Sequence, residues 1–242
     1  MYLSRIWLNP LRTGTQRMLR SPQVVHAAVL GGLPGQPVEE RPLWRLETES
    51  PHRLQLLVLT RSLPSWEHVV EQGGWPSAEE SQTLVRSVKP LLDRVERGRE
   101  FAFRLRANPV SATRRPAKPS PAQAEQLSVP GARGVRVPHR TASHQLAWFL
   151  SRTASWGFDV PETESGFPDV LLTGRERISF TKGGDDGRHR VTLSTATFEG
   201  RLRVADVDLL RQSLTEGVGP ARAYGCGLIT LAPVSSRSQG EV

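Results

Sequence analysis

The sequence predicts an α+β protein built from two ferredoxin-like (RRM-like) domains in tandem. Residues 1–110 read as strand, helix, strand, strand, helix, strand, the order of a split βαβ fold. Residues 111–133 are rich in proline, alanine, serine and arginine and lack an apolar period, as in an exposed linker. Residues 134–242 return to a looser form of the same order. The chain is therefore expected to form two domains joined by a linker.

Four strands are predicted in the first domain. Apolar and polar residues alternate in three segments, which predicts half-buried strands at residues 2–8, 43–48 and 53–60. A turn around Ser50 and Pro51 would let the second and third strands pair as a hairpin. A fourth strand over residues 101–106 closes the set, with Arg104 and Arg106 on the face opposite its phenylalanines.

Two helices complete the first domain. One is predicted over residues 22–30, because Ser21 suits the N-cap, Pro22 suits the first helical position and a glycine pair follows. The other is predicted over residues 81–96, where leucines and valines recur at helical spacing, with Pro90 producing a kink.

The second domain is predicted to end in a glycine-rich loop. Its predicted strands are residues 134–138, 175–182, 190–199 and 228–232, and its predicted helices are residues 143–154 and 206–214. The run Gly-Gly-Asp-Asp-Gly at residues 183–187 predicts a hairpin turn between the two middle strands. The glycine-rich loop, residues 217–227, lies between the last helix and the last strand.

Composition narrows the class of partner. The chain has 242 residues, with 32 Lys and Arg against 24 Asp and Glu and a formal net charge of +8. This excess predicts a polyanionic partner, although a GC-rich genome also enriches arginine, glycine and proline. The single cysteine, Cys226, excludes an internal disulfide framework and a thiolate zinc cluster within one chain, as expected in a reducing cytoplasm. The sequence contains no uninterrupted apolar run of about 18 residues, so it predicts no membrane-spanning helix.

The glycine-rich loop is the clearest candidate for ligand contact. Its glycines, Gly217, Gly219, Gly225 and Gly227, leave backbone amides open to a phosphate, and Arg222 adds a planar donor fork. Leucine and isoleucine follow the last glycine, which excludes a nucleotide P-loop, and the following strand argues against a dinucleotide fingerprint. Two interpretations stay open at this point: contact with a nucleic-acid backbone, or a structural turn before a buried strand.

Several segments together resemble one known family. They are MYLSRIWLN at the start, FRLRANP ending at Pro109, RVP at residues 136–138, FEG at residues 198–200 and GVGPARAYGCGLITLAP at residues 217–233. In this order they resemble the Cas6e endoribonucleases, also called CasE or Cse3, of type I-E CRISPR systems. The resemblance covers nearly the whole chain.

The resemblance implies cleavage of CRISPR repeat RNA without a metal or another cofactor. The 2′-hydroxyl attacks the neighbouring phosphorus and leaves a 2′,3′-cyclic phosphate, which calls for a base, an acid and positive charge on the phosphoryl oxygens. His26 matches the family's catalytic histidine. Gln23 stands where family members commonly carry tyrosine; glutamine can orient a phosphate but cannot transfer a proton, and Tyr224 is one substitute. No two of the six histidines have the spacing of a helical metal site.

The resemblance also implies a grip on the repeat stem-loop. A basic hairpin suits phosphate contacts along an A-form stem. The candidate RNA-binding residues are Arg104, Arg106, Arg136, Arg175, Arg177, Lys182, Arg188, Arg190, Gly217, Gly219, Arg222, Tyr224, Gly225 and Gly227. Cys226, between two glycines, is expected to fill space and not to react. The expected partners are the repeat RNA and other Cascade subunits, with a cytoplasmic protein that is monomeric when free.

Two rival hypotheses remain. Gln23 in place of tyrosine favours a binding and assembly subunit with little or no nuclease activity. A tandem RRM-like protein of another family would also be basic, but neither domain shows the aromatic-rich strand motif of a typical RRM.

Overall fold

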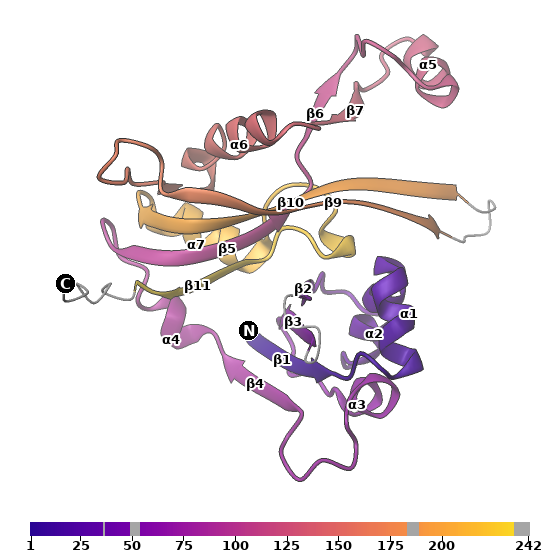
Figure 1. Cartoon of the computed structure of the whole chain (residues 1–242), viewed down its shortest axis with the longest axis vertical. Coiled ribbons are helices and arrows are strands. Elements are labelled where there is room, and N and C mark those ends of the chain that lie inside the picture. The colour runs from indigo at the N-terminus through magenta and orange to yellow at the C-terminus, as the bar shows by residue number, and fades with distance from the viewer. Residues whose placement is uncertain (36, 49–53, 183–188, 235–242) are drawn as a thin grey trace.

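The chain forms two ferredoxin-like units, each an antiparallel sheet with helices packed on one face (Figure 1). The structure, a computed structural model, describes residues 1–35, 37–48, 54–182 and 189–234. Within these residues, no helix is long and apolar enough to cross a membrane. The predicted α+β class with two ferredoxin-like units is confirmed.

The first unit contains β1 (Tyr2–Leu8), α1 (Thr13–Arg20), α2 (Pro22–Gly31), β2 (Leu43–Glu47), β3 (Leu54–Thr60), α3 (Glu67–Gly73) and β4 (Thr83–Ser87). Its strands lie in the order β2-β3-β1-β4, which is the ferredoxin-like order, and every pairing is antiparallel. Alternate strand residues such as Ile6 and Leu56 are fully buried beneath the helices, together with Val25 and Val29 of α2. This core fixes the position of α2.

The predicted helix over residues 81–96 is wrong. Residues 83–87 form the edge strand β4, which pairs with β1, and only a single turn of helix follows as α4 (Lys89–Leu92), with Pro90 in its first turn. The free edge of β1 needs hydrogen-bond partners, and the β-branched residues Thr83 and Val85 suit a strand that supplies them. By contrast, the predicted helix over residues 22–30 is confirmed by α2, which begins at Pro22.

The second unit contains β5 (Glu100–Ala107), α6 (Ala142–Leu150), a 3₁₀ turn η1 (Ala154–Trp156), β8 (Phe158–Asp159), β9 (Val170–Lys182), β10 (His189–Val204), α7 (Val207–Glu216), a 3₁₀ turn η2 (Arg222–Tyr224) and β11 (Ile229–Pro233). The strands run β11-β5-β10, and β9 pairs with β10. Phe103, Phe149 and Phe198 stack in its core beside Leu210 of α7. The turn predicted at residues 183–187 lies outside the described residues.

Strand β5 belongs to a different sheet from the one predicted. Residues 101–106 were expected to close the first sheet, but β5 pairs with β10 and with β11 and so opens the second unit. The predicted linker at residues 111–133 instead holds β6 (Val110–Thr113) and the capped helix α5 (Pro121–Ser128), and β7 (Val135–Pro138) pairs with β6 and not with the main sheet. Figure 1 shows this ribbon projecting from the second unit. We therefore propose a domain boundary just before Glu100, with residues 108–138 as an insertion.

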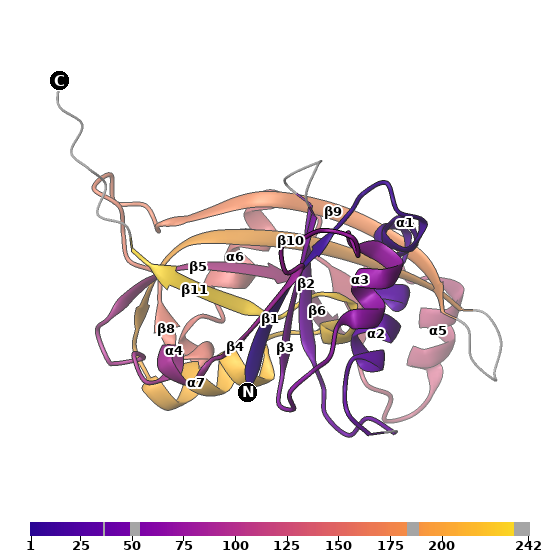
Figure 2. The same cartoon turned by 90° about the horizontal axis from the view of Figure 1, so that it is seen from below.

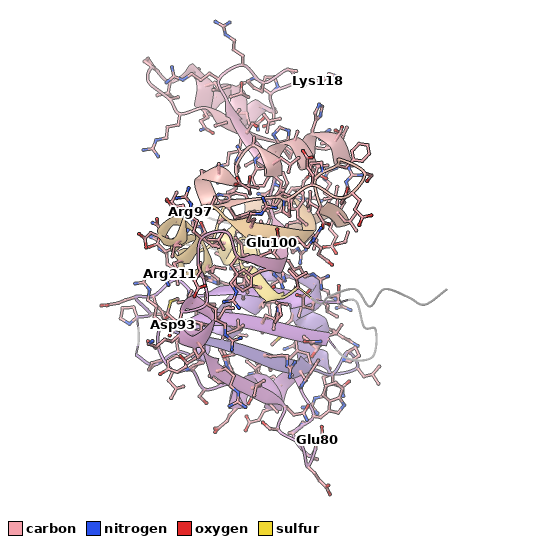
Figure 3. All side chains as sticks on the ribbon, turned by 90° about the vertical axis from the view of Figure 1, so that its left-hand side faces the viewer. Glu80, Asp93, Arg97, Glu100, Lys118 and Arg211 are labelled. Atoms are coloured by element: carbon pink, nitrogen blue, oxygen red, sulfur yellow. The ribbon has the colours of Figure 1, made fainter. Side chains whose placement is uncertain are left out.

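The two units share a small apolar interface. Leu43 and Leu59 of the first sheet pack with Val88 and with Leu228, the residue before β11. Figure 2, seen from below, shows the strands of the first sheet crossing in front of β5 and β11. The segment that connects the two units is fixed to the second unit. Arg211 of α7 donates hydrogen bonds to the Leu92 and Val95 carbonyls of this segment (3.1 and 3.5 Å). Figure 3 shows Arg211 at this junction.

Candidate functional site

His26 lies on α2, and the first core orients that helix. Val25 and Val29 point into the core on one side of α2, and His26 is half-buried beside them. Gln23 lies three residues earlier, so at about 3.6 residues per turn it shares a face with His26. The predicted adjacency of these two side chains is therefore compatible with the observed helix.

The glycine-rich loop meets this helix. Its 3₁₀ turn η2 contacts both α2 and β2, although the loop follows α7 of the second unit. Gly217, Gly219, Gly225 and Gly227 all have positive φ angles, between 68° and 90°, which other residues adopt at a cost. At Gly225 a Cβ would also lie 2.6 Å from the Trp44 ring. The loop thus needs its glycines to turn and to approach the first unit closely.

Two side chains of the loop have structural partners. The Arg222 guanidinium donates hydrogen bonds to the Gly219 carbonyl (3.1 Å) and the Glu216 carbonyl (2.7 Å), so it braces the loop against the end of α7. The Tyr224 ring packs on Phe180 of β9, with ring centroids 4.9 Å apart. Both were predicted to contact RNA, and the contacts observed hold the loop in shape.

Cys226 is fully buried between its two glycines. Burial raises the pKa of its thiol to about 12, because the thiolate would be removed from water. The thiol is therefore neutral near neutral pH, and the prediction that Cys226 fills space is confirmed.

The two arginines of β5 form ion pairs on the face of the second sheet opposite its helices. Arg104 contacts Glu47 of β2 (3.3 Å) and Glu199 of β10 (3.1 Å), and Arg106 contacts Glu176 of β9 (2.5 Å). Carboxylates therefore balance the charges of both arginines. The sequence predicted RNA contact for both arginines, and the local pattern does not reveal these glutamate partners.

Arg45 of β2 is a buried residue that sequence reasoning missed. Its side chain is 2% exposed and donates to Glu47 within the strand (2.6 Å). It also donates to the Leu228 carbonyl (2.9 Å), the Arg104 carbonyl (3.1 Å) and the Thr230 hydroxyl (2.7 Å), all in the second unit. Burial lowers the Arg45 pKa, and the Glu47 charge opposes that shift. Its position inside the apolar run Leu-Trp-Arg-Leu was the one available signal.

The basic hairpin presents its arginines on a different face. Arg175 and Arg177 alternate with Glu176, so they point away from the side of β9 that meets Arg106 and Tyr224. Arg175 donates to Gln145 of α6 (2.9 Å) and to the Arg140 carbonyl. Three other residues predicted to contact RNA are exposed: Arg136, Arg177 and Arg190. Arg188 lies outside the described residues, and the Lys182 side chain is not described. The sheet therefore does not bring all the candidates to one surface.

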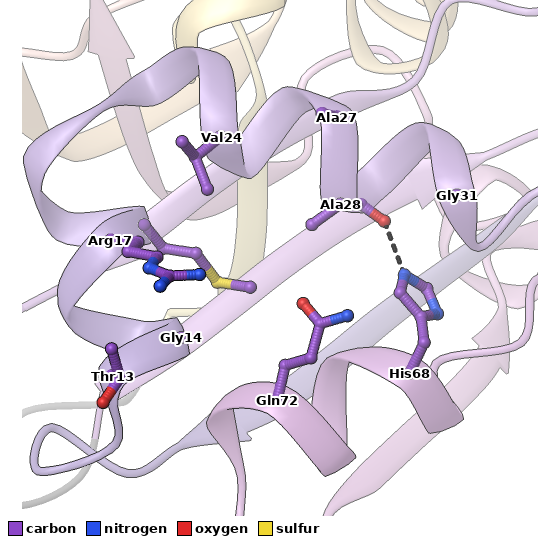
Figure 4. Close-up of a pocket in the computed structure, with 10 residues that line it drawn as sticks. Thr13, Gly14, Arg17, Val24, Ala27, Ala28, Gly31, His68 and Gln72 are labelled. Atoms are coloured by element: carbon purple, nitrogen blue, oxygen red, sulfur yellow. Dashed lines mark hydrogen bonds between the residues drawn. The ribbon is translucent and has the colours of Figure 1, made fainter.

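A cavity of about 610 Å³ lies on another side of α2. Figure 4 shows Ala27, Ala28 and Gly31 of α2 lining it, opposite His68 and Gln72 of α3. The Ala28 carbonyl lies 2.9 Å from His68 Nε2. The residues of α2 that line this cavity face away from His26 at helical spacing, so the cavity is separate from the His26 site. Among the described residues, no three His, Cys, Asp or Glu side chains lie together as metal ligands.

Comparisons with known proteins agree over most of the chain. The family model described as "CRISPR associated protein" matches residues 1–233. The chain is 30% identical to the CRISPR-associated endoribonuclease Cse3 of Thermus thermophilus, over 96% of this chain and 100% of the relative. It is 26% identical to the CRISPR system Cascade subunit CasE of Escherichia coli, over 79% of this chain and 89% of that one.

Solved structures show the same relationship. Cse3 bound to a 19 nt RNA matches with a TM-score of 0.71 and 28% identity, over 96% of this chain and all of that chain. Thermus thermophilus Cse3 bound to an RNA representing a pre-cleavage complex matches with a TM-score of 0.71 and 27% identity, over 96% and 98% of the two chains. Because the family model matches residues 1–233 and the fold matches over 96% of this chain, the chain belongs to the CRISPR-associated family of Cse3 and CasE, the type I-E Cas6e proteins.

Proposed function

We propose that this protein is an endoribonuclease that cuts CRISPR precursor RNA on the 3′ side of the repeat hairpin and stays bound to the guide RNA as a Cascade subunit. The observation that carries the proposal is the full-length similarity to the endoribonuclease Cse3, 30% identical over 96% of this chain. The contact between the helix of His26 and the glycine-rich loop supports it. The two features lie in separate units of the fold, and this contact brings them together at one place.

The proposed reaction is metal-independent transesterification. His26 exchanges a proton with the 2′-hydroxyl or with the departing 5′-oxygen, leaving a 2′,3′-cyclic phosphate and a 5′-hydroxyl. Gln23 donates a hydrogen bond that orients the scissile phosphate. The glycine-rich loop lies beside the RNA strand at α2. The Gly217, Gly225 and Gly227 amides already donate to the Ser213, Arg222 and Arg106 carbonyls, so these three glycines shape the loop and do not themselves hold a phosphate.

Stem binding is assigned to the exposed arginines. Within the part of the chain that the structure describes, Arg177 and Arg190 form no ion pair. Both are exposed on the β9–β10 hairpin, which Figure 1 shows extending past the helices of the first unit. They suit phosphate contacts along an A-form stem, together with the predicted Lys182 and Arg188. Arg104 and Arg106 lie on the other face of the sheet and are already balanced by glutamates, so we do not assign the stem to them. We also propose that the protein is cytoplasmic and monomeric before it joins the complex.

Gln23 supports one alternative, a subunit that binds and protects the hairpin while cutting weakly or not at all. A glutamine supplies no second acid–base group next to His26, so proton transfer would depend on a single side chain. RNA binding and assembly into the complex would be unaffected by the lack of a second acid–base group.

The decisive test compares wild type, His26→Ala and His144→Ala on the cognate repeat RNA in EDTA. His144 is an exposed histidine on α6 and serves as the matched control. We expect cleavage in EDTA, loss of cleavage with a 2′-deoxy group at the cut site, and a drop of about 10²- to 10⁴-fold for His26→Ala only. Unchanged binding by His26→Ala supports a catalytic role. Tight binding by the wild type without any cutting would favour the alternative.

A further inference from the structure

The burial of Arg45 is explained by the second unit and not by the first. A guanidinium taken out of water is costly unless it is paired and hydrogen-bonded. Only one of its described hydrogen bonds, to Glu47, stays within the first unit. The Leu228 and Arg104 carbonyls and the Thr230 hydroxyl all come from β5 and β11 or the residue that precedes β11. Arg45 therefore forms a polar connection between the two sheets.

These partners lie where the glycine-rich loop ends. Leu228 directly follows Gly227, the last glycine of the loop, and Thr230 is two residues further on. The Gly227 amide donates to the Arg106 carbonyl (2.8 Å), and the Arg104 carbonyl on the same strand accepts from Arg45. The exit of the loop is thus held by β5 on one side and by Arg45 on the other.

The neighbouring residue, Trp44, connects this point to the helix of His26. Trp44 is 2% exposed and packs in the same core as Val25 and Val29 of α2. Its ring also lies directly under Gly225, where no Cβ would fit. Two successive residues of β2 therefore act together: Trp44 supports α2 and the middle of the loop, and Arg45 holds the exit of the loop.

We propose that Arg45 is a positioning residue that sets the placement of the glycine-rich loop relative to His26. This inference rests on the proposed nuclease function, because it assigns the two features to one reaction site. A loop displaced by about 1 Å would move the bound phosphate away from His26, and errors of that size cost on the order of 10²-fold in rate. Removal of Arg45 should therefore slow cutting more than it weakens binding.

The test uses Arg45→Met, which keeps the aliphatic stem and removes the donors, with Arg86→Met as control. Arg86 is an exposed arginine on β4 of the same sheet. Three quantities are measured for each variant: the single-turnover cleavage rate at saturating protein, the Kd for a repeat with a 2′-deoxy group at the cut site, and hydrogen exchange of residues 217–230. For Arg45→Met we expect a rate lower by about tenfold or more, faster exchange in the loop, and a Kd within about threefold of wild type. Arg86→Met should match wild type.

A milder variant, Thr230→Val, removes one acceptor and leaves Arg45 with its other partners. We expect the cleavage rate to fall by about two- to fivefold, and this result stands in for Arg45→Met if that variant does not fold. In a His26→Ala background, Arg45→Met should cause no further loss, since both changes affect one step.

Wild-type rates and wild-type loop exchange in Arg45→Met, or in Thr230→Val if Arg45→Met does not fold, would overturn the proposal. A purely structural role would lower the unfolding midpoint of Arg45→Met and leave the rate of the folded protein unchanged, which also contradicts the proposal. If the wild type itself fails to cut, the nuclease function is wrong, and the exchange comparison still decides whether Arg45 holds the loop.

Discussion

Arginine has two distinct roles in this chain, and burial separates them. Arg45 is buried and donates to Glu47 and to three acceptors of the second unit, whereas Arg177 and Arg190 are exposed on the β9–β10 hairpin. All three lie in strands, where a local pattern shows only that a residue alternates with its neighbours. The sequence could predict that the chain binds a polyanion, but not which arginines remain available for it.

The local sequence around His26 also fails to reveal its role. Nothing in the local pattern around His26 distinguishes it from an ordinary helical histidine; only the family resemblance singled it out. The structure adds that η2 of the second unit contacts its helix. That contact joins residues about two hundred positions apart in the chain, and no local periodicity carries such information.

Cys226 provides a prediction at the scale of one residue. Burial raises its thiol pKa to about 12, so the thiolate that reacts with disulfide reagents is scarce at mildly alkaline pH in the folded protein. We expect the native protein to resist an aromatic disulfide reagent and the protein in guanidinium to react at its single cysteine. Rapid labelling of the native protein, with the fold intact by circular dichroism, would contradict this assignment.

Among the elements, those with strong local signals were predicted and those formed by pairing were not. Pro22 and the following glycines predicted α2 correctly, and Asp206 caps α7 through the Leu209 amide (2.9 Å). Residues 83–87 carried an apparent helical spacing, yet the open edge of β1 recruits them as a strand. Edge strands such as β4 depend on a partner that local sequence does not reveal.

The glycine-rich loop provides a prediction at the scale of an element. Gly225 and Gly98 have nearly the same φ, 80° and 82°. A Cβ at Gly225 would overlap the Trp44 ring, whereas a Cβ at Gly98 would have no atom within 4 Å. Gly98→Ala should cost about 1 kcal/mol from the left-handed backbone alone. Gly225→Ala should cost about 2 to 4 kcal/mol, because overlap with a packed ring is added.

Urea denaturation of the two glycine variants measures this difference, and cleavage assays add a second readout. Gly225→Ala should also lose cleavage, since its loop contacts α2, while folded Gly98→Ala should keep it. Equal stabilities of the two variants would show that the loop does not pack on Trp44 as described.

At the scale of the whole molecule, an interface of apolar and polar contacts joins the two units. Leu43, Leu59 and Leu228 supply its apolar part, and Arg45 and Arg104 supply its polar part. Each unit has its own core, but the candidate site exists only where the units meet. We therefore propose that function requires this relative position of the two sheets.

Leu228→Ala tests this coupling. Leu228 is 2% exposed, and its truncation should cost about 2 to 5 kcal/mol through lost burial and a cavity. We expect the transitions followed by far-UV circular dichroism and by tryptophan fluorescence to shift together in urea, because the interface couples both cores. The control is Leu171→Ala, a leucine that is 69% exposed and should leave the midpoint unchanged. Separate transitions in Leu228→Ala would mean that the units unfold independently.

The sequence by itself determined the fold class, the positions of α2 and of the long strands, the family and the expectation of an RNA partner. These follow from local periodicity, capping residues, net charge and motif order, all of which can be read along the chain without knowing which distant residues meet. Only the tertiary structure decided that β5 belongs to the second sheet, that Arg104 and Arg106 are balanced by glutamates, and that Arg45 and Trp44 connect the glycine-rich loop to the helix of His26. The physical reason is that strand pairing and the burial of a charge depend on partners distant in sequence, which become neighbours only when the two sheets pack.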